Sequence, residues 1–328
     1  MTVGADIVRP RFMDADDLRR AHGVRPYKRK GASSLANGIL IIDKPAGWTS
    51  MDVCAKLRGM FHEKRVGHAG TLDPMATGVL PVFIGRATRA VEFAADSDKE
   101  YIAGLKLGVV TNTQDTTGEI VEEHPVEVSG EQLRGVLERF TGNIEQIPPM
   151  YSAIKVNGKK LYELARKGKE VERKPRPVTI HALELLGWPD AGEDFTLRVA
   201  CSKGTYVRTL CHDIGQALGC GGCMSSLRRV KAAGFTLADS VTLEAVQNAV
   251  DRGEGESLLL PVDAYFAGLP MLALKNAGAE KKIRNGAALK APDIPDGEYR
   301  VYGMDKTFLA LGKAADGTLT TVKSFFEV

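Results

Sequence analysis

Hydrophobic and polar residues follow two different spacings in the first ordered part of the chain. Residues 38–42 form a continuous apolar run that Pro45 closes, and residues 79–84 form another, which predicts two buried strands. Between them, Thr49 and Asp52 have the spacing of a capping box, and apolar residues follow at helical intervals. The pattern therefore predicts a strand, a helix and a second strand.

The middle of the chain alternates strand-like and helix-like segments. Residues 101–110 and 119–123 predict a strand pair joined by the polar turn 112–118, and Ser129 with Gln132 forms a second capping box that starts a helix. Further along, the same two spacings predict strands over 150–156, 178–188 and 195–202 and helices over 160–167, 205–218 and 242–250. Short helices between strands indicate an α+β domain.

Residues 251–256, which mix charged residues with glycine, predict a domain boundary. Beyond it, Gly and Asp turns separate strands expected over 270–274, 299–302, 308–311 and 322–328, with one helix expected over 277–284. Short strands at regular intervals predict a small β-rich C-terminal domain over 262–328, closed as a small barrel.

The composition is that of an ordinary globular protein. The chain has 328 residues, 44% apolar and 26% charged, which is enough for about two domains. No segment approaches the roughly 20 apolar residues of a membrane span, and the N-terminus lacks the apolar core of a signal peptide, so we expect a cytoplasmic protein. Residues 1–36 predict a basic, flexible N-terminal extension. The five cysteines are an odd number scattered through apolar segments, which favours reduced, buried thiols.

Positive charge is concentrated in two segments, although the net charge is only +3. Residues 155–176 carry nine Lys or Arg against three Glu, and residues 201–231 carry five against one Asp. Asn157-Gly158 is a strong hairpin signal, so the first segment predicts a basic insertion that projects from the core. Two such segments predict a face that binds a polyanion, of which nucleic acid is the commonest.

One carboxylate stands alone in a segment of small and apolar residues. Asp73 lies within the stretch 67–78, where glycines allow close backbone approach and Pro74 disfavours helical geometry for the preceding residue. A rigid, partly dry loop makes a carboxylate responsive to its partners, as in a catalytic acid. A simple turn cap is the alternative for an isolated Asp-Pro.

Three other short segments carry polar or aromatic residues that a fold alone does not require: Lys99-Glu100-Tyr101, residues 201–208 and Leu227-Arg228-Arg229. Arg208 falls in the first turn of a predicted helix, where a buried guanidinium would need a carboxylate partner. The alternatives are ordinary strand packing for Tyr101 and an Arg208 side chain that reaches solvent.

These motifs, in their order, resemble those of the bacterial TruB-type tRNA pseudouridine-55 synthases. The resemblance runs through residues 38–45, 67–74, 147–153, 158–162 and 201–208 and is strong over about 38–235. It implies a pseudouridine synthase fold, a mixed and largely antiparallel sheet with a central catalytic cleft. It also implies a catalytic domain over 37–252, an RNA-clamping insertion at about 150–178 and a PUA-like RNA-binding domain at the C-terminus.

The resemblance assigns roles residue by residue. It implies that Asp73 is the catalytic aspartate, Tyr101 the active-site tyrosine and Arg208 the arginine that pairs with the aspartate. Lys44 matches a lysine near the active site, Leu227 a leucine lining the uracil pocket, and His68 the histidine that fills the space left by flipped nucleotides. The further substrate-binding residues expected are Gly70, Thr71, Leu72, Lys155, Lys159, Lys160 and Tyr206.

The implied reaction isomerises the T-loop uridine-55 of tRNA to pseudouridine. Nothing is oxidised and nothing is lost, so we expect no cofactor and no metal, in keeping with a sequence that has no P-loop or dinucleotide fingerprint. Asp73 acts either as nucleophile or as base, and both readings stay open. Tyr101 can stack on the uracil and remove its C5 proton, and a flipped nucleotide is required. The expected partner is the T-arm of tRNA, bound by a monomer.

Other readings are weighed against this one. Cys220-Gly221-Gly222-Cys223, with Cys211 and His212, invites a zinc or redox site, but Cys211 falls in the interior of a predicted helix. An RNA-binding or RNA-chaperone module with secondary catalysis belongs to a different class. An Asp-dependent glycosidase would release free uracil, and such sites commonly use two carboxylates.

Overall fold

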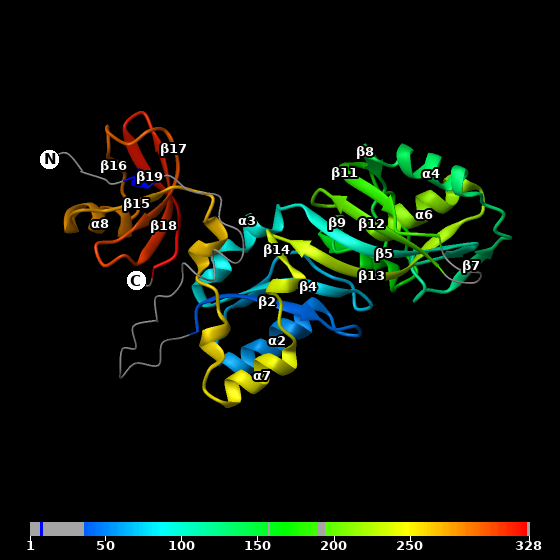
Figure 1. Ribbon diagram of the computed structural model, residues 1–328, viewed down its shortest axis with the longest axis horizontal. Helices are drawn as coiled ribbons and strands as arrows, with labels where there is room; N and C mark the ends of the chain where they lie inside the picture. The colour runs from blue at the N-terminus through cyan, green and yellow to red at the C-terminus, as the bar shows by residue number, and fades with distance from the viewer. Residues whose placement is uncertain (1–6, 9–35, 157, 189–193, 327–328) are drawn as a thin grey trace.

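The computed structural model describes residues 7–8, 36–156, 158–188 and 194–326, which form a large mixed sheet and a separate β-rich C-terminal module (Figure 1). In spatial order the main path of the large sheet is β2 (Gly38–Lys44), β4 (Thr77–Ile84), β13 (Gly222–Ala232), β5 (Lys99–Leu107), β12 (Phe195–Cys201), β11 (Arg176–Leu185) and β8 (Gly142–Gln146). Only β4 and β13 run parallel on this path. The predicted α+β class, with a mixed and largely antiparallel sheet, is confirmed.

The predicted strand, helix and strand at the start of the sheet are confirmed. α2 (Ser50–Phe61) begins at a reciprocal cap, in which the Thr49 side chain accepts from the Asp52 amide and the Asp52 carboxylate accepts from the Thr49 amide. The helix buries Val53 and Leu57 in the core beneath β2 and β4. A short strand, β3 (Val66–His68), adds to β4 and leads directly into the Asp73 loop.

The central strand β13 is absent from the elements that the hydrophobic pattern predicts. It lies parallel to β4 at Gly78 and antiparallel to β5 over its whole length. A Cβ on Gly78 would lie 2.2 Å from the carbonyl oxygen of Arg229, so only glycine lets the two strands approach this closely. Gly78 also has φ of +99°, which other residues rarely adopt.

The strand pair predicted over 101–110 and 119–123 is only partly present. β5 ends at Leu107, Gly108 takes φ of +82°, and a separate strand β6 (Val109–Thr111) pairs with β7 (Ile120–Glu123). The second capping box is confirmed, because Ser129 and Gln132 cap α4 (Gly130–Arg139). α4 and α6 (Val207–Leu218) lie near the far end of the sheet from α2 (Figure 1).

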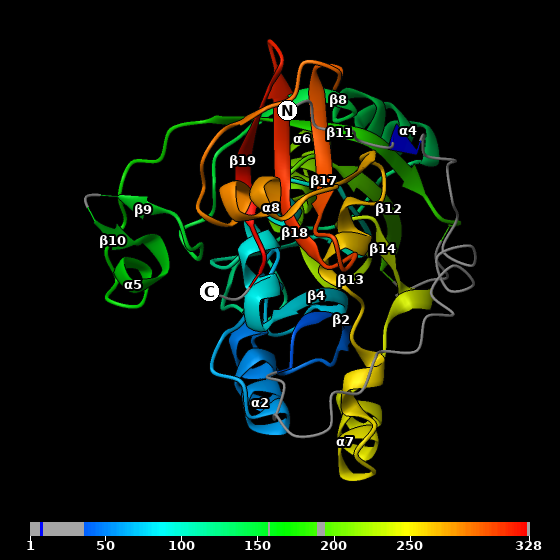
Figure 2. The same cartoon turned by 90° about the vertical axis from the view of Figure 1, so that its left-hand side faces the viewer.

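The basic insertion stands away from the sheet, as Figure 2 shows on its left-hand side. It contains a two-stranded hairpin, β9 (Lys155–Val156) and β10 (Lys159–Lys160), followed by α5 (Leu161–Ala165). The predicted strand over 150–156 is shorter than expected, since residues 151–153 form a bend. Asn157 of the predicted hairpin turn lies outside the described residues.

The C-terminal module has its own sheet and its own apolar core. Its elements are β15 (Met271–Ala273), α8 (Ala277–Arg284), β16 (Leu289–Lys290), β17 (Gly297–Tyr302), β18 (Phe308–Ala315) and β19 (Thr318–Ser324). An aromatic cluster around Phe266 joins it to the helix between β4 and β5, with the Phe266 ring centroid 5.5 Å from that of Phe93 on this helix and 5.8 Å from that of Phe325. Of the N-terminal extension expected over residues 1–36, the described part is Ala36 and β1 (Ile7–Val8), which pairs with β15.

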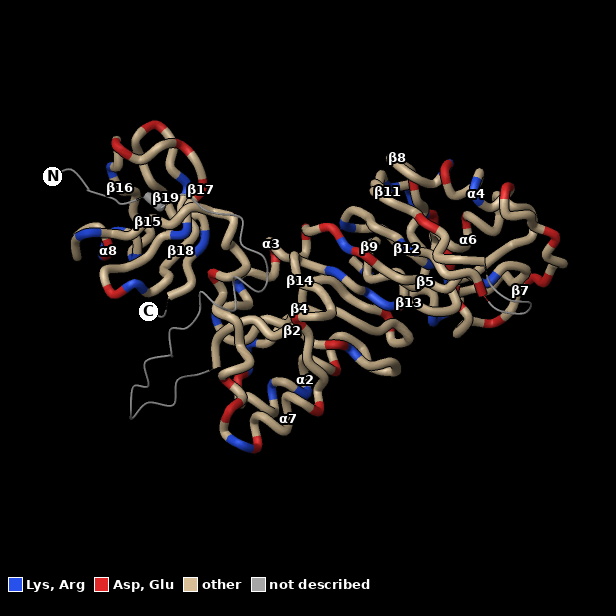
Figure 3. Tube along the Cα trace, viewed as in Figure 1, with Lys and Arg blue, Asp and Glu red and all other residues tan. Residues whose placement is uncertain are grey.

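The remaining elements border the large sheet or connect the two parts. They are η1 (Gly85–Ala90), α3 (Val91–Ala95), β14 (Phe235–Thr236), η2 (Leu237–Asp239), α7 (Leu243–Asp251), η3 (Gly255–Leu258) and η4 (Val262–Phe266). Among the described residues, no helix is long and apolar enough to cross a membrane. Lys, Arg, Asp and Glu are scattered along the chain, and a group of basic residues lies at the end of α8 (Figure 3).

Candidate active site

Asp73 lies in a loop that is tied to the start of α2. The Ser50 hydroxyl accepts a hydrogen bond from the Leu72 amide at 2.9 Å and lies 3.2 Å from the Leu72 carbonyl, and the Gly47 amide donates to the Pro74 carbonyl at 2.8 Å. Leu72 is buried, whereas the Asp73 side chain is 36% exposed. The loop is therefore anchored on both sides of a carboxylate that remains accessible.

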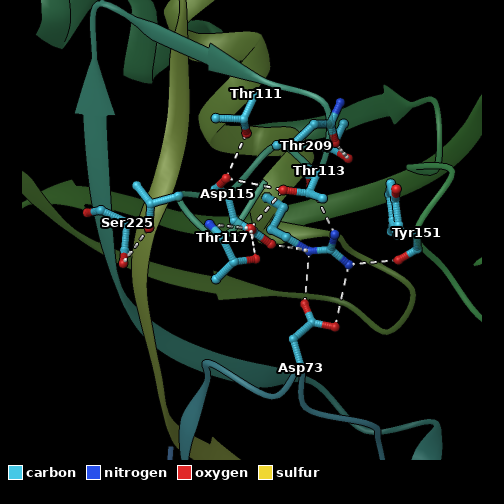
Figure 4. Close-up of polar contacts among 11 residues, drawn as sticks. Asp73, Thr111, Thr113, Asp115, Thr117, Tyr151, Thr209 and Ser225 are labelled. Atoms are coloured by element: carbon cyan, nitrogen blue, oxygen red, sulfur yellow. Dashed lines mark hydrogen bonds and ion pairs between the residues drawn. The ribbon is translucent and has the colours of Figure 1, made fainter. Parts of the chain in front are cut away.

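Two nitrogens of the Arg208 guanidinium contact the two oxygens of this carboxylate (Figure 4). Its Nε lies 2.9 Å from Oδ2 of Asp73 and its second terminal nitrogen 3.4 Å from Oδ1. The Arg208 side chain is only 6% exposed, because it leaves the first turn of α6 and points into the protein. The two residues are 135 positions apart in the chain, and only the fold brings them together.

Further groups contact the Arg208 guanidinium on the side away from Asp73. Arg208 donates to the carbonyl oxygens of Thr113 at 3.0 Å and Tyr151 at 2.9 Å, and its Nε lies 3.7 Å from a carboxylate oxygen of Asp115. Asp115 is itself buried and accepts from the Thr113 hydroxyl and from both the amide and the hydroxyl of Thr117. These contacts leave Arg208 little freedom, so its fork is aimed before any substrate arrives.

Asp115 is a polar residue at this site that sequence reasoning missed. Its signal was weak, because an aspartate among threonines in a turn is ordinary turn chemistry. The spacing of Thr113, Asp115 and Thr117 only acquires meaning once the turn is seen to fold against Arg208 (Figure 4).

The Lys44 side chain connects the loop after β2 to the Asp73 loop. Its side chain is fully buried, and Nζ donates to the carbonyl oxygens of Pro45 at 2.9 Å, Trp48 at 2.6 Å and Pro74 at 3.3 Å. Burial lowers the pKa of Lys44 to about 8, and the negative charge of Asp73 partly opposes this shift. Lys44 thus fixes the backbone next to Asp73 and adds a nearby positive charge.

Tyr101 and Arg229 face each other across neighbouring strands. They are direct partners in the register of β5 and β13, so their side chains lie on the same face of the sheet. Tyr101 is 8% exposed and Arg229 1% exposed. Burial raises the pKa of the Tyr101 phenol, while the positive charge of Arg229 opposes that rise.

Gly70 makes room for the Arg229 guanidinium. A Cβ at this position would lie 3.2 Å from a terminal nitrogen of Arg229, and the backbone has φ of +79°. The Gly70 carbonyl accepts from Arg229 at 3.0 Å. Gly70, which was expected to let the backbone approach a ligand, therefore also leaves space for the Arg229 side chain.

The other expected substrate residues on the sheet lie around this group. His68 is half-buried on β3, and burial together with the charge of Arg229 lowers the pKa of its imidazole, which favours the neutral ring at pH 7. Leu227 is buried on β13 opposite Ala103, and Thr71 is exposed next to Leu72.

Tyr206 is positioned by a buried amide. The Tyr206 amide donates to the Gln146 side-chain oxygen at 3.0 Å, and the Gln146 side-chain nitrogen donates to the Tyr206 carbonyl at 3.2 Å. Gln146 is 1% exposed and holds the N-cap of α6 two residues before Arg208. Sequence reasoning missed this residue as well.

The expected RNA-contacting lysines are not part of this group. Lys155 and Lys159 are exposed on the hairpin of β9 and β10 (Figure 2). Lys160 lies over the ring of Tyr162, with Nζ 5.4 Å from its centroid. Within the described ranges, the five cysteines are buried free thiols, and no three His, Cys, Asp or Glu side chains are grouped as metal ligands.

The fold and this geometry define a class of protein. A mixed sheet with one accessible carboxylate held by a buried arginine, and with a buried tyrosine on the central strand β5, is the arrangement expected of a pseudouridine synthase. Residues 58–207 match the TruB family pseudouridylate synthase N-terminal domain, and residues 208–267 match the tRNA pseudouridylate synthase B C-terminal domain. The chain belongs to the TruB family of pseudouridylate synthases.

Relatives with this family name match nearly the whole chain. It is 46% identical over 292 residues to tRNA pseudouridine synthase B of Azoarcus sp. (strain BH72), covering 89% of this chain and 96% of the relative. It is 49% identical over 290 residues to the protein of that name from Lachnoclostridium phytofermentans, covering 84% and 94%. The predicted family is confirmed.

Solved structures share the fold. A chain in a crystal structure of a Cbf5-Nop10-Gar1 complex superposes with a TM-score of 0.66 at 27% identity, covering 90% of this chain and 85% of the other. A chain from a structure of an H/ACA RNP bound to a substrate RNA gives a TM-score of 0.68 at 22% identity, covering 100% and 96%, and so supports the fold alone.

Proposed function

We propose that this chain isomerises a uridine in the T-loop of tRNA to pseudouridine and that Asp73 carries the chemistry. The observation that supports this most is the Asp73 carboxylate held by Arg208 at 2.9 Å while remaining 36% exposed. A carboxylate that is both aimed and accessible can act on a bound nucleotide, whereas a turn cap needs no buried arginine.

The reaction conserves all atoms of the substrate. The bond between uracil N1 and the ribose C1′ breaks, the uracil turns while bound, and C5 forms the new bond to C1′. C5 then loses its proton and N1 gains one. Asp73 serves either by attacking the substrate or by removing a sugar proton, and both roles need the ionised form that Arg208 stabilises.

Each residue around Asp73 has a separate proposed role in binding the uridine or in proton transfer. Tyr101 stacks against the uracil and accepts the C5 proton, Leu227 lines the uracil pocket, and His68 occupies the space that the flipped nucleotides leave. Lys44 keeps the Asp73 loop in place through the Pro74 carbonyl. Flipping costs a few kcal/mol, and a T-loop lowers that cost because its bases are already partly unstacked.

The basic insertion is proposed to clamp the T-arm phosphates. Lys155 and Lys159 are exposed on a hairpin that stands off the sheet, where a nucleic acid backbone can reach them (Figure 2). Phosphate contacts position the RNA without reading its sequence. We place the C-terminal module alongside as a PUA-like RNA-binding domain, and we propose a cytoplasmic monomer.

Product analysis on a T-arm transcript tests the function. The protein should convert one T-loop uridine to pseudouridine and release no uracil. Free uracil with an abasic site would make it a glycosidase, and binding without any product would make it an RNA-binding module; either result overturns the proposal. Asp251→Asn, at the exposed end of α7, should behave as the native protein.

A further inference from the structure

Trp48 lies in an exposed loop that is hydrogen-bonded to the Asp73 loop. The Trp48 carbonyl accepts from Lys44 Nζ at 2.6 Å, and the same nitrogen donates to the Pro74 carbonyl at 3.3 Å. The Gly47 amide also donates to the Pro74 carbonyl, at 2.8 Å. The loop that carries Trp48 is thus joined to the residue that directly follows Asp73, and the two loops lie side by side (Figure 1).

The Trp48 side chain makes no polar or aromatic contact within the described part of the chain. The residue is 36% exposed, its indole nitrogen donates to no described residue, and its ring packs on no other aromatic ring there. The other tryptophan, Trp188, is 51% exposed, yet its ring packs edge to face on Phe195 with centroids 5.1 Å apart. Trp48 therefore differs from Trp188 in having an aromatic ring without an aromatic partner.

The surface that contains Trp48 is apolar and continues to the catalytic loop. Exposed apolar residues of the two loops and of the first turn of α2 include Pro45, Ala46, Met51 and Pro74. Residues 45–51 carry no charge, so this surface offers nothing to a phosphate. Single exposed apolar side chains are ordinary, whereas a group of them beside an accessible carboxylate indicates a binding surface.

The backbone around Trp48 is fixed before any ligand binds. Thr49 follows directly and forms the reciprocal cap of α2 with Asp52, whose carboxylate is thereby occupied. The next residue, Ser50, is buried and hydrogen-bonds the backbone of Leu72. A ring whose backbone is already ordered can contact a ligand at little cost in conformational entropy.

We propose that Trp48 is a substrate-contacting residue whose ring stacks on a base next to the target uridine in the T-loop. The inference rests on the proposed isomerisation and adds a contact to it. When the uridine leaves the loop to reach Asp73, the neighbouring base loses a stacking partner. An aromatic ring beside the same carboxylate replaces that partner, and the uncharged face of a base suits an apolar surface without lysine or arginine.

Trp48→Leu and Trp48→Phe test the inference through affinity for T-arm RNA in a filter assay. Trp48→Leu removes the aromatic ring and should weaken binding by about 5- to 100-fold, whereas Trp48→Phe keeps a smaller ring and should lose less. Stacking releases no counterions, so the slope of log affinity against log salt should stay native in both variants. The matched control Trp188→Leu should bind RNA as the native protein does. Native affinity in Trp48→Leu would overturn the inference.

Abasic substitutions in the RNA separate this contact from a structural role. The base on either side of the target uridine is removed in turn, and one of the two RNAs should bind the native protein about 5- to 100-fold more weakly. On that RNA, Trp48→Leu should cause no further loss, because the ring has no base to stack on. A full further loss on both abasic RNAs would show that Trp48 acts through the fold and would refute the inference.

The two tryptophans of the chain allow an optical measurement as well. Trp188→Phe leaves Trp48 as the only tryptophan, and saturating T-arm RNA should quench its fluorescence. The single Trp188 that remains in Trp48→Phe should respond little. Unquenched Trp48 emission at saturation would overturn the inference, whatever the effect of Trp48→Leu on folding.

Two further outcomes distinguish this inference from the alternatives. A native dimer that Trp48→Leu dissociates, with RNA affinity unchanged, would make the surface a contact between copies of the chain and would overturn the inference. If the native protein forms no pseudouridine, the proposed function itself fails. If it forms pseudouridine and Trp48→Leu binds RNA with native affinity, only this inference fails.

Discussion

The Asp73 carboxylate and the Arg208 guanidinium meet at 2.9 Å and 3.4 Å, with the arginine buried and the aspartate accessible. Because the guanidinium is already buried, its desolvation takes place during folding and not when the substrate binds. The substrate contacts only the carboxylate. Two carbonyl oxygens and Asp115 fix the guanidinium from the far side. The fold therefore presents an aimed anion rather than an exposed ion pair.

Arg208→Lys should be nearly as damaging as loss of the side chain. An ammonium cannot reach the Asp73 carboxylate, the Thr113 carbonyl and the Tyr151 carbonyl with the geometry of a planar fork. We expect single-turnover pseudouridine formation to fall by about 10²- to 10³-fold, while T-arm RNA still binds in a filter assay. Near-native turnover would show that positive charge alone suffices.

Asp115→Ala should weaken both stability and activity. It leaves the Thr117 amide and hydroxyl without their acceptor and removes one of the two acceptors of the Thr113 hydroxyl, at a cost of about 1–3 kcal/mol in the free energy of unfolding. It also frees one side of Arg208. Urea denaturation and single-turnover rates measure the two effects. Unchanged turnover in a folded variant would contradict the role assigned to Asp115.

Lys44 predicts a specific pH dependence of stability. Its pKa is about 8 in the folded protein against 10.5 ordinarily, so between these values the unfolded chain binds more protons at this site. The contribution of Lys44 to the free energy of unfolding therefore rises as pH increases from about 8 to 10.5, by up to roughly 3 kcal/mol. Lys44→Met should lack this rise in urea titrations across that range. Parallel curves for the two proteins would refute the assignment.

Gly70→Ala should cost more than its backbone conformation explains. Both Gly70 and Gly219 have φ near +80°, so alanine at either position strains the backbone by about 1 kcal/mol. Only at Gly70 does the new Cβ press on Arg229, whereas Gly219 has open space around it. We expect Gly70→Ala to lower turnover and Gly219→Ala to lower stability alone. Equal turnover in the two variants would argue against the role of Gly70.

Replacement of Lys155 and Lys159 by Gln should weaken RNA binding without slowing the chemistry. Each lost phosphate contact reduces the slope of log affinity against log salt by about 1. We expect a higher KM for T-arm RNA, a shallower salt dependence and an unchanged single-turnover rate at saturation. A lower saturating rate with native affinity would place these lysines in the chemistry instead.

Local signals predicted the parts of the fold that local physics governs. The capping boxes at Thr49 and Ser129 located α2 and α4, and the apolar run before Lys44 located β2. β13 was not predicted because it begins among glycines and cysteines and places Arg229 on the buried face. A charged residue at a buried position breaks the alternation of apolar and polar residues that identifies a strand. A buried arginine at such a position can be recognised only when its partners in space are known.

The site residues also fall into those that the sequence predicted and those that only the structure shows. Family motifs named Asp73 and Arg208, whose pairing spans 135 residues and could not be derived from spacing. Asp115 and Gln146 act through Arg208 and Tyr206, and their own sequence surroundings are those of ordinary turn and strand residues. The unusual feature in each case is a contact between distant segments, so the fold had to be seen first.

We propose that Asp73 performs the isomerisation while Arg208 holds its carboxylate in place. The most direct measurement is single-turnover tritium release from C5-labelled uridine in a T-arm RNA by Asp73→Asn, with RNA affinity measured in parallel. We expect no detectable release and near-native binding, because asparagine keeps the shape of the side chain but loses the charge. Release at a rate close to that of the native protein would contradict it.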